Sequence, residues 1–422
     1  MIEKKAKERH RIPRLLLLAG IIFIYACIST VSVNAVASSS EAIQEVVTVS
    51  DTVTDKEGQI LPGVNVPDII LWEKGKGNYN NYRIPSLILA PNGDLLAFCE
   101  GREAGDAGDI NILLKRSKDL GKNWSEEIVV WDDAHNTCGN PCPVVDRSNG
   151  RIWLFLTWNL GTDHESEIVR KESQETRKPY LCYSDDNGLT WSTPVEMTQS
   201  CKDPSWGWYA TGPGVGIQMR SERFSDRLII PANHSYDDPE GNVRNGPFTY
   251  GSHVLISDDH GKTWRRSQPI QPNCNESQVA ELSDGTLMMN MRSYYDEYCR
   301  AVATSTDGGE TWTEVRHDRQ LVESRCQASL INYGKYREQK MLLFSNPSVA
   351  RGRTHMTIKA SFNDGEHWSV SRCIHPGPSA YSCLIRLDNG EIGILYEHGI
   401  TGRYERIVFQ KFSPEELFGI GD

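Results

Sequence analysis

A short turn motif that recurs five times constrains the fold of this chain more than any other feature. Each copy has the form Ser-x-Asp-x-Gly-x-x-Trp, and the last copy has Asn in place of Asp. The copies occupy residues 117–124, 184–191, 257–264, 305–312 and 361–368. Their first residues lie 67, 73, 48 and 56 positions apart, and each interval suits one four-stranded sheet with its loops. The repeat therefore predicts an all-β protein, a β-propeller.

The residue types in the motif have a physical explanation. Asp and Ser side chains bond backbone amides in tight turns, and Gly supplies the positive φ that such a turn requires. We expect the Trp to cover hydrophobic surface between neighbouring sheets. The motif is structural and by itself carries no chemistry.

The composition agrees with a single turn-rich fold. A propeller would absorb most of the 422 residues in one domain. The 35 Gly, 20 Pro, 11 Trp and 16 Tyr suit strands and turns, and after the N-terminal segment no periodic pattern predicts a helix longer than about 12 residues.

The N-terminus differs from the rest of the chain. Basic residues precede an apolar run over 15–33 and a small-residue site at Ala35-Val36-Ala37, which predicts a secretory signal peptide over 1–37. The alternatives are a permanent anchor, because 19 residues can just span a bilayer, and lipidation at Cys27. Residues 38–65 are interpreted as a linker and 66–422 as the propeller. The protein is thus expected to be exported to the periplasm, the cell surface or the medium.

Charge and cysteine content limit the partners. Residues 1–37 hold six Lys/Arg and two Asp/Glu, so their removal takes the net charge from −11 to −15. An acidic body argues against nucleic acid, or a membrane surface, as partner. The ten cysteines after Cys27 form no CxxC pairs, which argues against zinc. Cys138 and Cys142 are close enough to pair, and most others are expected to be buried thiols.

The first candidate functional residue is Arg83, in Tyr82-Arg83-Ile84-Pro85, where it precedes an apolar strand. Together with the five turn motifs and further landmarks in the same order, this Y-R-I-P segment makes residues 66–416 resemble the bacterial exo-sialidases. That resemblance implies a six-bladed propeller, a retaining glycoside hydrolase and no metal or organic cofactor. It also implies sialylated glycoproteins, glycolipids and oligosaccharides as substrates.

The resemblance implies three arginines that bind the substrate carboxylate. A guanidinium suits that task because its planar fork binds a carboxylate bidentately and stays charged. Arg83 matches the first arginine and Arg292, in Met289-Asn290-Met291-Arg292, the second. For the third, both Arg351 and Arg353 are available. We favour Arg353, because Arg353-Thr354-His355-Met356-Thr357 matches the family's R-x-[HN]-M-T segment.

The implied nucleophile is Tyr381, in Ser379-Ala380-Tyr381-Ser382. Most retaining glycosidases use two carboxylates, and sialidases with a Tyr nucleophile are exceptions. A neutral phenol avoids repulsion by the carboxylate on the anomeric carbon, but with a pKa near 10 it needs a base. Glu276 matches that base, on a strand next to that of Arg292. Glu281 is the competing carboxylate, but its place before Ser283-Asp284-Gly285 suggests a hairpin residue.

The acid/base is expected in the glycine-rich loop after Glu100-Gly101-Arg102. Asp106 and Asp109 both qualify. We favour Asp106, because the family's catalytic Asp precedes a G-D-I-[DN] segment that residues 108–111 match. Arg102 resembles an additional arginine that contacts hydroxyls of the sugar ring.

Two further residues complete the implied site. Glu397, in Tyr396-Glu397-His398, matches the carboxylate that orients the first arginine, since a buried guanidinium needs such a partner. Asn140 falls where relatives carry a polar contact to the sugar. The expected function is exo-α-sialidase. The alternatives are a trans-sialidase or intramolecular trans-sialidase, and a non-catalytic glycan-binding propeller.

Overall fold

The computed structural model describes residues 66–239 and 247–419, and almost all of its regular structure is β-strand. The predicted signal peptide and linker lie outside the described residues. Within them, no helix is both long and apolar enough to span a membrane.

The strands form six groups of four, and consecutive members of a group pair antiparallel. Blade 1 consists of β2 (Asn81–Leu89), β3 (Leu95–Arg102), β4 (Ile110–Ser117) and β5 (Ile128–Trp131). Blade 2 consists of β6 (Thr137–Val145), β7 (Ile152–Asn159), β8 (Lys178–Ser184) and β9 (Val195–Glu196). Blade 3 consists of β10 (Tyr209–Thr211), β12 (Leu228–Asp237), β13 (Phe248–Ser257) and β14 (Arg265–Arg266), with β11 (Ile217–Gln218) added beside β12.

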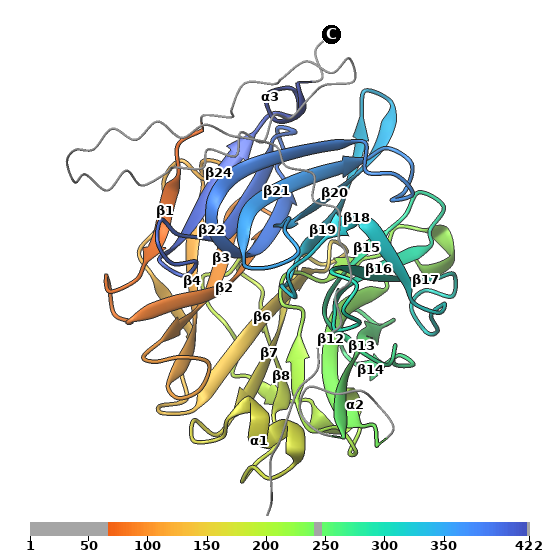
Figure 1. Ribbon diagram of the computed structural model, residues 1–422. Helices are drawn as coiled ribbons and strands as arrows, with labels where there is room; N and C mark the ends of the chain where they lie inside the picture. The colour runs from red at the N-terminus through yellow and green to blue at the C-terminus, as the bar shows by residue number, and fades with distance from the viewer. Residues whose placement is uncertain (1–65, 240–246, 420–422) are drawn as a thin grey trace, which may run out of the picture. The chain divides into compact units, whose positions relative to one another are not determined.

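The second half of the chain repeats the arrangement. Blade 4 consists of β15 (Cys274–Glu281), β16 (Leu287–Ser293), β17 (Cys299–Ser305) and β18 (Arg316–Val322). Blade 5 consists of β19 (Ser329–Tyr336), β20 (Gln339–Pro347), β21 (Thr354–Ser361) and the first half of β22 (Val370–Arg386). Blade 6 consists of the second half of β22, β23 (Ile392–His398), β24 (Arg406–Phe412) and β1 (Ile69–Glu73). Figure 1 shows the blades following one another in chain order, from orange to blue.

Blade 6 closes the ring with the first strand of the described chain. The register pairs Ile69 with Phe409 and Glu73 with Arg406. The first, inner strands of the blades, β2, β6, β10, β15, β19 and β22, follow one another around the ring, with β2 against both β6 and β22 and with β12 of blade 3 against β15. The six-bladed propeller expected from the sequence is the fold of this chain.

The five motifs form the turns between the third and fourth strands of blades 1 to 5. In the first, Ser117 Oγ accepts a hydrogen bond from the amide of Gly121 (2.9 Å) and Asp119 Oδ1 accepts one from the amide of Asn123 (2.8 Å). The variant copy keeps both bonds, since Asn363 Oδ1 accepts from the amide of His367. Blade 6 has no such turn because its fourth strand, β1, comes from the other end of the chain.

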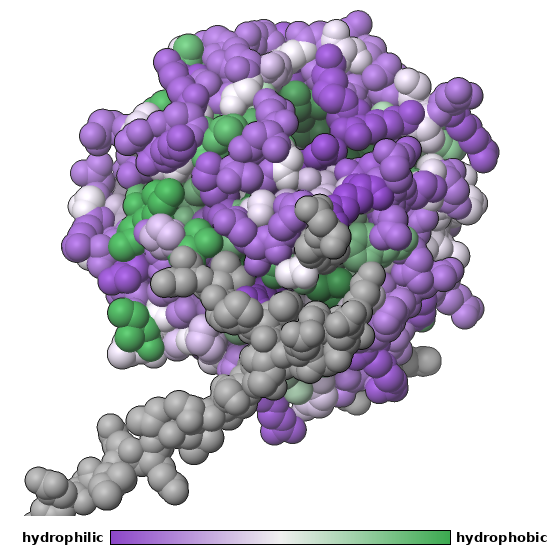
Figure 2. Space-filling view, turned by 90° about the horizontal axis from the view of Figure 1, so that it is seen from above, coloured by the Kyte–Doolittle hydropathy of each residue, from purple (hydrophilic) through white to green (hydrophobic). Residues whose placement is uncertain are grey.

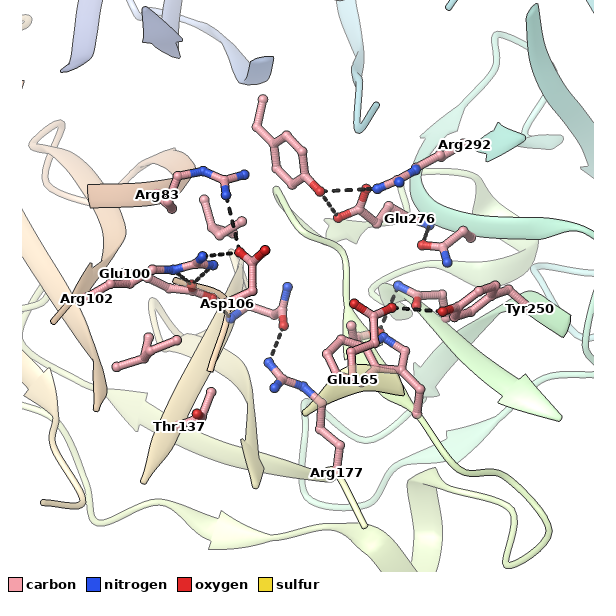
Figure 3. A pocket seen from close by; sticks show the side chains of 18 of the residues that line it. Arg83, Glu100, Arg102, Asp106, Thr137, Glu165, Arg177, Tyr250, Glu276 and Arg292 are labelled. Carbon is pink, nitrogen blue, oxygen red and sulfur yellow. Dashed lines mark hydrogen bonds and ion pairs between the residues drawn. The ribbon is translucent and has the colours of Figure 1, made fainter. Parts of the chain in front are cut away.

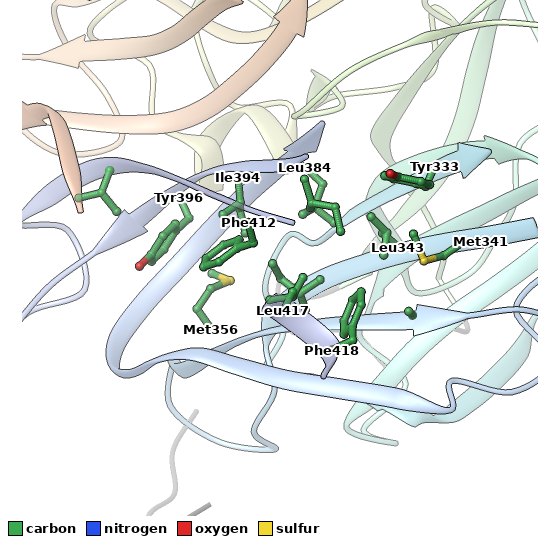
Figure 4. Close-up of a cluster of buried hydrophobic side chains, with 14 residues drawn as sticks. Tyr333, Met341, Leu343, Met356, Leu384, Ile394, Tyr396, Phe412, Leu417 and Phe418 are labelled. Atoms are coloured by element: carbon green, nitrogen blue, oxygen red, sulfur yellow. The ribbon is translucent and has the colours of Figure 1, made fainter. Parts of the chain in front are cut away.

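The motif tryptophans pack between blades, as predicted. Trp124 of blade 1 meets Phe409 of blade 6 edge to face, with ring centroids 5.5 Å apart. The motif glycine completes this contact: Gly121 has φ of 83°, and a Cβ there would lie 2.2 Å from Phe409 Cε1. Figure 4 shows the cluster between blades 5 and 6, where Met356, Ile394 and Phe412 pack with residues of helix α3 (Pro414–Phe418). Hydrophilic side chains cover most of the described surface visible in Figure 2.

Cys138 and Cys142, which their spacing would allow to pair, do not form a disulfide. Both are free, buried thiols on β6. Cys138 packs between blades 1 and 2 with residues such as Phe98, whereas Cys142 packs between blades 2 and 3 with residues such as Ile230. The two thiols therefore belong to different interfaces of their blade. The other described cysteines are also free, and all but Cys373 are buried.

Candidate active site

A cavity of about 560 Å³ opens at one end of the inner strands. It is lined by several arginines, carboxylates and aromatic rings, and Figure 3 shows most of them pointing into one space. The lining residues are Arg83, Ile84, Glu100, Arg102, Asp106, Ile110, Thr137, Asn140, Glu165, Ser166, Arg177, Trp208, Ala210, Asn233, Tyr250, Asn275, Glu276, Arg292, Tyr294, Arg353, Tyr381, Arg403 and Tyr404.

Strand direction explains why residues so distant in sequence meet there. The first and third strands of every blade begin at the pocket end, and the second strands finish there, because neighbouring strands are antiparallel. Arg83 and Glu276 accordingly stand near the starts of inner strands, and Arg292 near the end of a second strand. Arg353 directly precedes a third strand, β21.

Tyr381 and Glu276 form a short hydrogen-bonded pair in the pocket. The phenol of Tyr381 donates a hydrogen bond of 2.5 Å to Oε1 of Glu276. Arg292 Nη1 donates to the other carboxylate oxygen at 2.8 Å and to the phenol oxygen at 3.3 Å. Burial raises the pKa of Tyr381 well above its usual value, the charge of Glu276 raises it further, and Arg292 opposes both. The phenol is therefore protonated in the free protein, and Glu276 is placed to take its proton.

Three guanidinium groups face this pair. Arg83 and Arg353 lie 5.2 and 5.6 Å from the centre of the Tyr381 ring, and Arg292 lies on the Glu276 side. Arg353 is held by the carbonyl of Arg325 (2.8 Å). The alternative, Arg351, is exposed and donates to the hydroxyl of Tyr298, outside the pocket lining.

Glu397 is fully buried and links the Arg83 guanidinium to the backbone of Tyr381. Its Oε1 accepts bonds from Arg83 Nε (2.6 Å) and from the amide of Ile84 (3.0 Å), and its Oε2 accepts one from the amide of Tyr381 (3.0 Å). Ile84 has φ of 61°, an unfavourable value for a β-branched residue, where β2 carries a bulge. The carboxylate thus fixes the first guanidinium and the backbone of the phenol together.

Asp106 stands on the loop between β3 and β4, within reach of two arginines. Its Oδ1 accepts from Arg102 Nη1 and, at 3.4 Å, from Arg83 Nη1. The side chain is 80% exposed, but that surface faces the pocket. Partial removal from bulk water raises the pKa of Asp106, and the positive charges of Arg102 and Arg83 outweigh that effect and hold it below the usual value. Asp109 instead accepts a bond from Asn111 and does not line the cavity.

Asn140 lies in the pocket, but its carboxamide oxygen is occupied. That oxygen accepts bonds from Arg177 Nη2 (2.6 Å) and Thr157 Oγ1 (3.1 Å). The Arg177 guanidinium also stacks on Trp208, 4.4 Å from the ring centre. Burial lowers the pKa of Arg177 to about 10, against the attraction of carboxylates such as Glu100. Sequence reasoning missed Arg177 and Trp208 because neither stands in a recognisable segment such as those of Arg83 and Tyr381.

Glu165 and Tyr404 also line the pocket and were also missed, because neither stands in a recognisable segment. Glu165 is the first residue of the short helix α1 (Glu165–Arg170), inserted between β7 and β8. Its Oε1 accepts a bond of 2.9 Å from the hydroxyl of Tyr250. Burial raises the pKa of Glu165, and the Tyr250 bond opposes the rise. Tyr404 was missed too: its ring lies 3.7 Å from the Arg83 guanidinium, and its hydroxyl accepts from Arg353 Nη1 at 3.0 Å.

The competing carboxylate Glu281 lies away from the pocket. It ends β15, as the hairpin interpretation predicts, and accepts bonds from the amides of Arg220 (2.7 Å) and Ser221 (2.8 Å). Of the nine site residues expected from the sequence, all but Glu397 line the cavity, and Glu397 lies directly behind it.

Fold and site together define a six-bladed β-propeller with an arginine-rich pocket at one end of its inner strands. The family model for the BNR repeat-like domain matches residues 93–394. An exo-alpha-sialidase of Aspergillus fumigatus is 30% identical over 79% of this chain and 84% of its own length. The chain belongs to the sialidase family of BNR repeat proteins.

Two further relatives are similar over most of this chain. A sialidase of Micromonospora viridifaciens is 35% identical over 78% of it. The Hadza microbial sialidase Hz136 is a solved structure with a TM-score of 0.72 and 32% identity, covering 86% of this chain and 72% of its own. The chain spans about half, 52%, of the length of the Micromonospora protein.

Proposed function

We propose that this protein is an exo-α-sialidase that releases terminal α-linked sialic acid from glycoproteins, glycolipids and oligosaccharides with retention of configuration. One observation carries the proposal: the Tyr381 phenol donates to Glu276 at 2.5 Å beside three guanidinium groups. The relatives named sialidases support it. By the signal-like sequence of residues 1–37, the protein acts after export, and either an uncleaved N-terminus or a lipid on Cys27 would attach it to a membrane.

The guanidinium groups of Arg83, Arg292 and Arg353 bind the substrate carboxylate. Three fixed positive charges from different blades suit a group that sits directly on the anomeric carbon, because they orient that carbon over the phenol. Glu397 and the Arg325 carbonyl hold two of them in place before substrate arrives. The cationic pocket also attracts an anionic sugar although the whole chain is acidic.

In the first step, Asp106 protonates the glycosidic oxygen, and the bond from that oxygen to the anomeric carbon breaks. The Tyr381 oxygen bonds to the anomeric carbon while its proton passes to Glu276. In the second step, Asp106 takes a proton from water, and the water oxygen replaces the phenol oxygen at the anomeric carbon. Glu276 returns the proton to the phenol, so that both carboxyl groups regain their starting states. Two displacements give net retention.

The test is the release of 4-methylumbelliferone from its α-sialoside by the purified protein. Arg353→Ala is expected to raise KM strongly, whereas Arg351→Ala, two residues away and outside the pocket, is the matched control. Hydrolysis of sialyllactose with and without added lactose then separates hydrolysis from transfer. Binding of the sialoside without any turnover would favour a glycan-binding propeller instead.

A further inference from the structure

Arg300 is a fully buried cation that does not line the pocket. It stands on β17 and pairs with Glu323, which is also buried, at 2.6 Å. Desolvating two charges is costly, and a buried ion pair is often no more stabilising than apolar residues of equal size. General stability is therefore a weak explanation for this pair, and its other bonds indicate a more specific role.

The first set of bonds fixes the strand that carries Arg292. Arg300 Nε donates to Asn290 Oδ1 at 2.6 Å, and its Nη2 donates to the Asn290 carbonyl at 3.3 Å. Glu323 Oε1 accepts a bond of 2.7 Å from the amide of Ser293. The pair thus holds β16 on both sides of Arg292, two residues before it and one after.

The second set of bonds fixes the segment 323–327, between β18 and β19. Arg300 Nη1 binds that segment at two points, the Glu323 carboxylate and the Cys326 carbonyl (2.7 Å). The segment in turn holds the third arginine, because the Arg325 carbonyl accepts from Arg353 Nη2 at 2.8 Å.

The same segment also reaches the strand of the phenol. Gln327 Oε1 accepts a bond from the amide of Ser382, and its Nε2 donates to the Ser382 carbonyl, both at 3.0 Å. Ser382 follows Tyr381 directly. Segment 323–327 therefore contacts blade 4 beside Arg292, blade 5 at Arg353 and blade 6 beside Tyr381.

We propose that Arg300 is a positioning residue: through Glu323 and segment 323–327 it sets the spacing of Arg292, Arg353 and Tyr381, and so the carboxylate-binding geometry. This inference rests on the proposed function for its kinetic readout. Arg300 touches neither substrate nor reacting atoms. Its guanidinium acts indirectly, because the strand of Arg292 and the segment that contacts Arg353 and the strand of Tyr381 are both bonded to it or to Glu323.

The chain offers a matched control in Arg116 and Asp94, a second buried pair at 2.6 Å, in blade 1 and outside the pocket. Arg300→Lys keeps the charge but loses the planar fork, and Arg116→Lys makes the same change where no pocket residue depends on it. We expect Arg300→Lys to raise KM for the aryl sialoside, and Ki for 2-deoxy-2,3-didehydro-N-acetylneuraminic acid, about tenfold or more. Arg116→Lys should leave both within about twofold while lowering the melting temperature comparably.

Glu323→Gln, with Asp94→Asn as its control, gives the same comparison if Arg300→Lys does not fold. Unchanged KM and Ki in Arg300→Lys and Glu323→Gln, with only lowered stability, would overturn the proposal. A crystal structure of either variant is independent of turnover, and there we expect the Arg353–Arg325 bond to lengthen. An inactive wild-type protein would refute the proposed function alone, whereas an undisturbed Arg353–Arg325 bond would refute the positioning role.

Discussion

The phenol oxygen of Tyr381 lies 2.5 Å from Oε1 of Glu276, although 105 residues separate the two in the chain. The pair joins the inner strands of two blades, and no other residue stands between donor and acceptor. Arg292 holds the carboxylate on its other side, through the second carboxylate oxygen. This geometry makes the role of each partner testable.

Tyr381→Phe removes the oxygen that we propose as the nucleophile and leaves the ring in place. We expect the kcat for sialyllactose to fall by on the order of 10³-fold or more, because the covalent step has no other nucleophile. Tyr298→Phe, outside the pocket lining, is the control and should keep wild-type rates. Circular dichroism checks that both variants fold. Wild-type turnover by Tyr381→Phe would disprove the assignment.

Asp106→Ala should discriminate between leaving groups. Loss of a general acid matters most for a sugar alkoxide, which needs protonation, and least for 4-methylumbelliferone, which leaves readily as an anion. We expect kcat/KM for sialyllactose to fall at least about 100-fold more than that for the aryl sialoside. Asp109→Ala is the control, and equal losses on both substrates in Asp106→Ala would contradict its role as acid.

Arg102→Gln tests the charge environment of Asp106. The guanidinium of Arg102 lowers the pKa of Asp106, so its removal should raise that pKa. The protonated acid then persists to higher pH, and the alkaline limb of kcat/KM against pH for sialyllactose should move upward. In the wild-type protein the lowered pKa of Asp106 also contributes to the stability of the fold. That contribution is fully present when the pH is above the pKa of Asp106 in the unfolded chain, and it is lost as the pH falls through the pKa of Asp106 in the folded protein. An alkaline limb at the same pH in Arg102→Gln as in the wild-type protein would show that Arg102 does not set the pKa of Asp106.

Gly121→Ala tests the turn motif against a matched glycine. Gly121 and Gly75 both have positive φ, 83° and 72°, so both substitutions carry the strain of a left-handed alanine. Only at Gly121 would the new Cβ collide with Phe409, whereas nothing lies within 4 Å at Gly75. We expect the free energy of unfolding to fall by roughly 1–3 kcal/mol more for Gly121→Ala than for Gly75→Ala. Equal losses in denaturant titrations would show that the blade contact is unimportant.

The fold was predictable because its turn repeats, and a repeat in sequence implies a repeat in structure. The ring closure was not, since β1 is only five residues long and carries no turn motif to mark its blade. The same contrast holds in the pocket. Arg83 and Tyr381 stand in recognisable segments, whereas Glu165 lies on a helix inserted in one blade and Arg177 just before a strand start. Their convergence depends on the relative placement of blades, which no local pattern encodes.

The closure of blade 6 by β1 has a consequence for biosynthesis. The guanidinium of Arg83 is held by Glu397, 314 residues later, and β1 pairs with β24 near the end of the described chain. A polypeptide emerging from the ribosome therefore carries its first arginine long before the carboxylate that orients it. Catalytic competence should appear abruptly, only after blade 6 is translated, so the nascent chain stays inert until the strands of that blade have emerged.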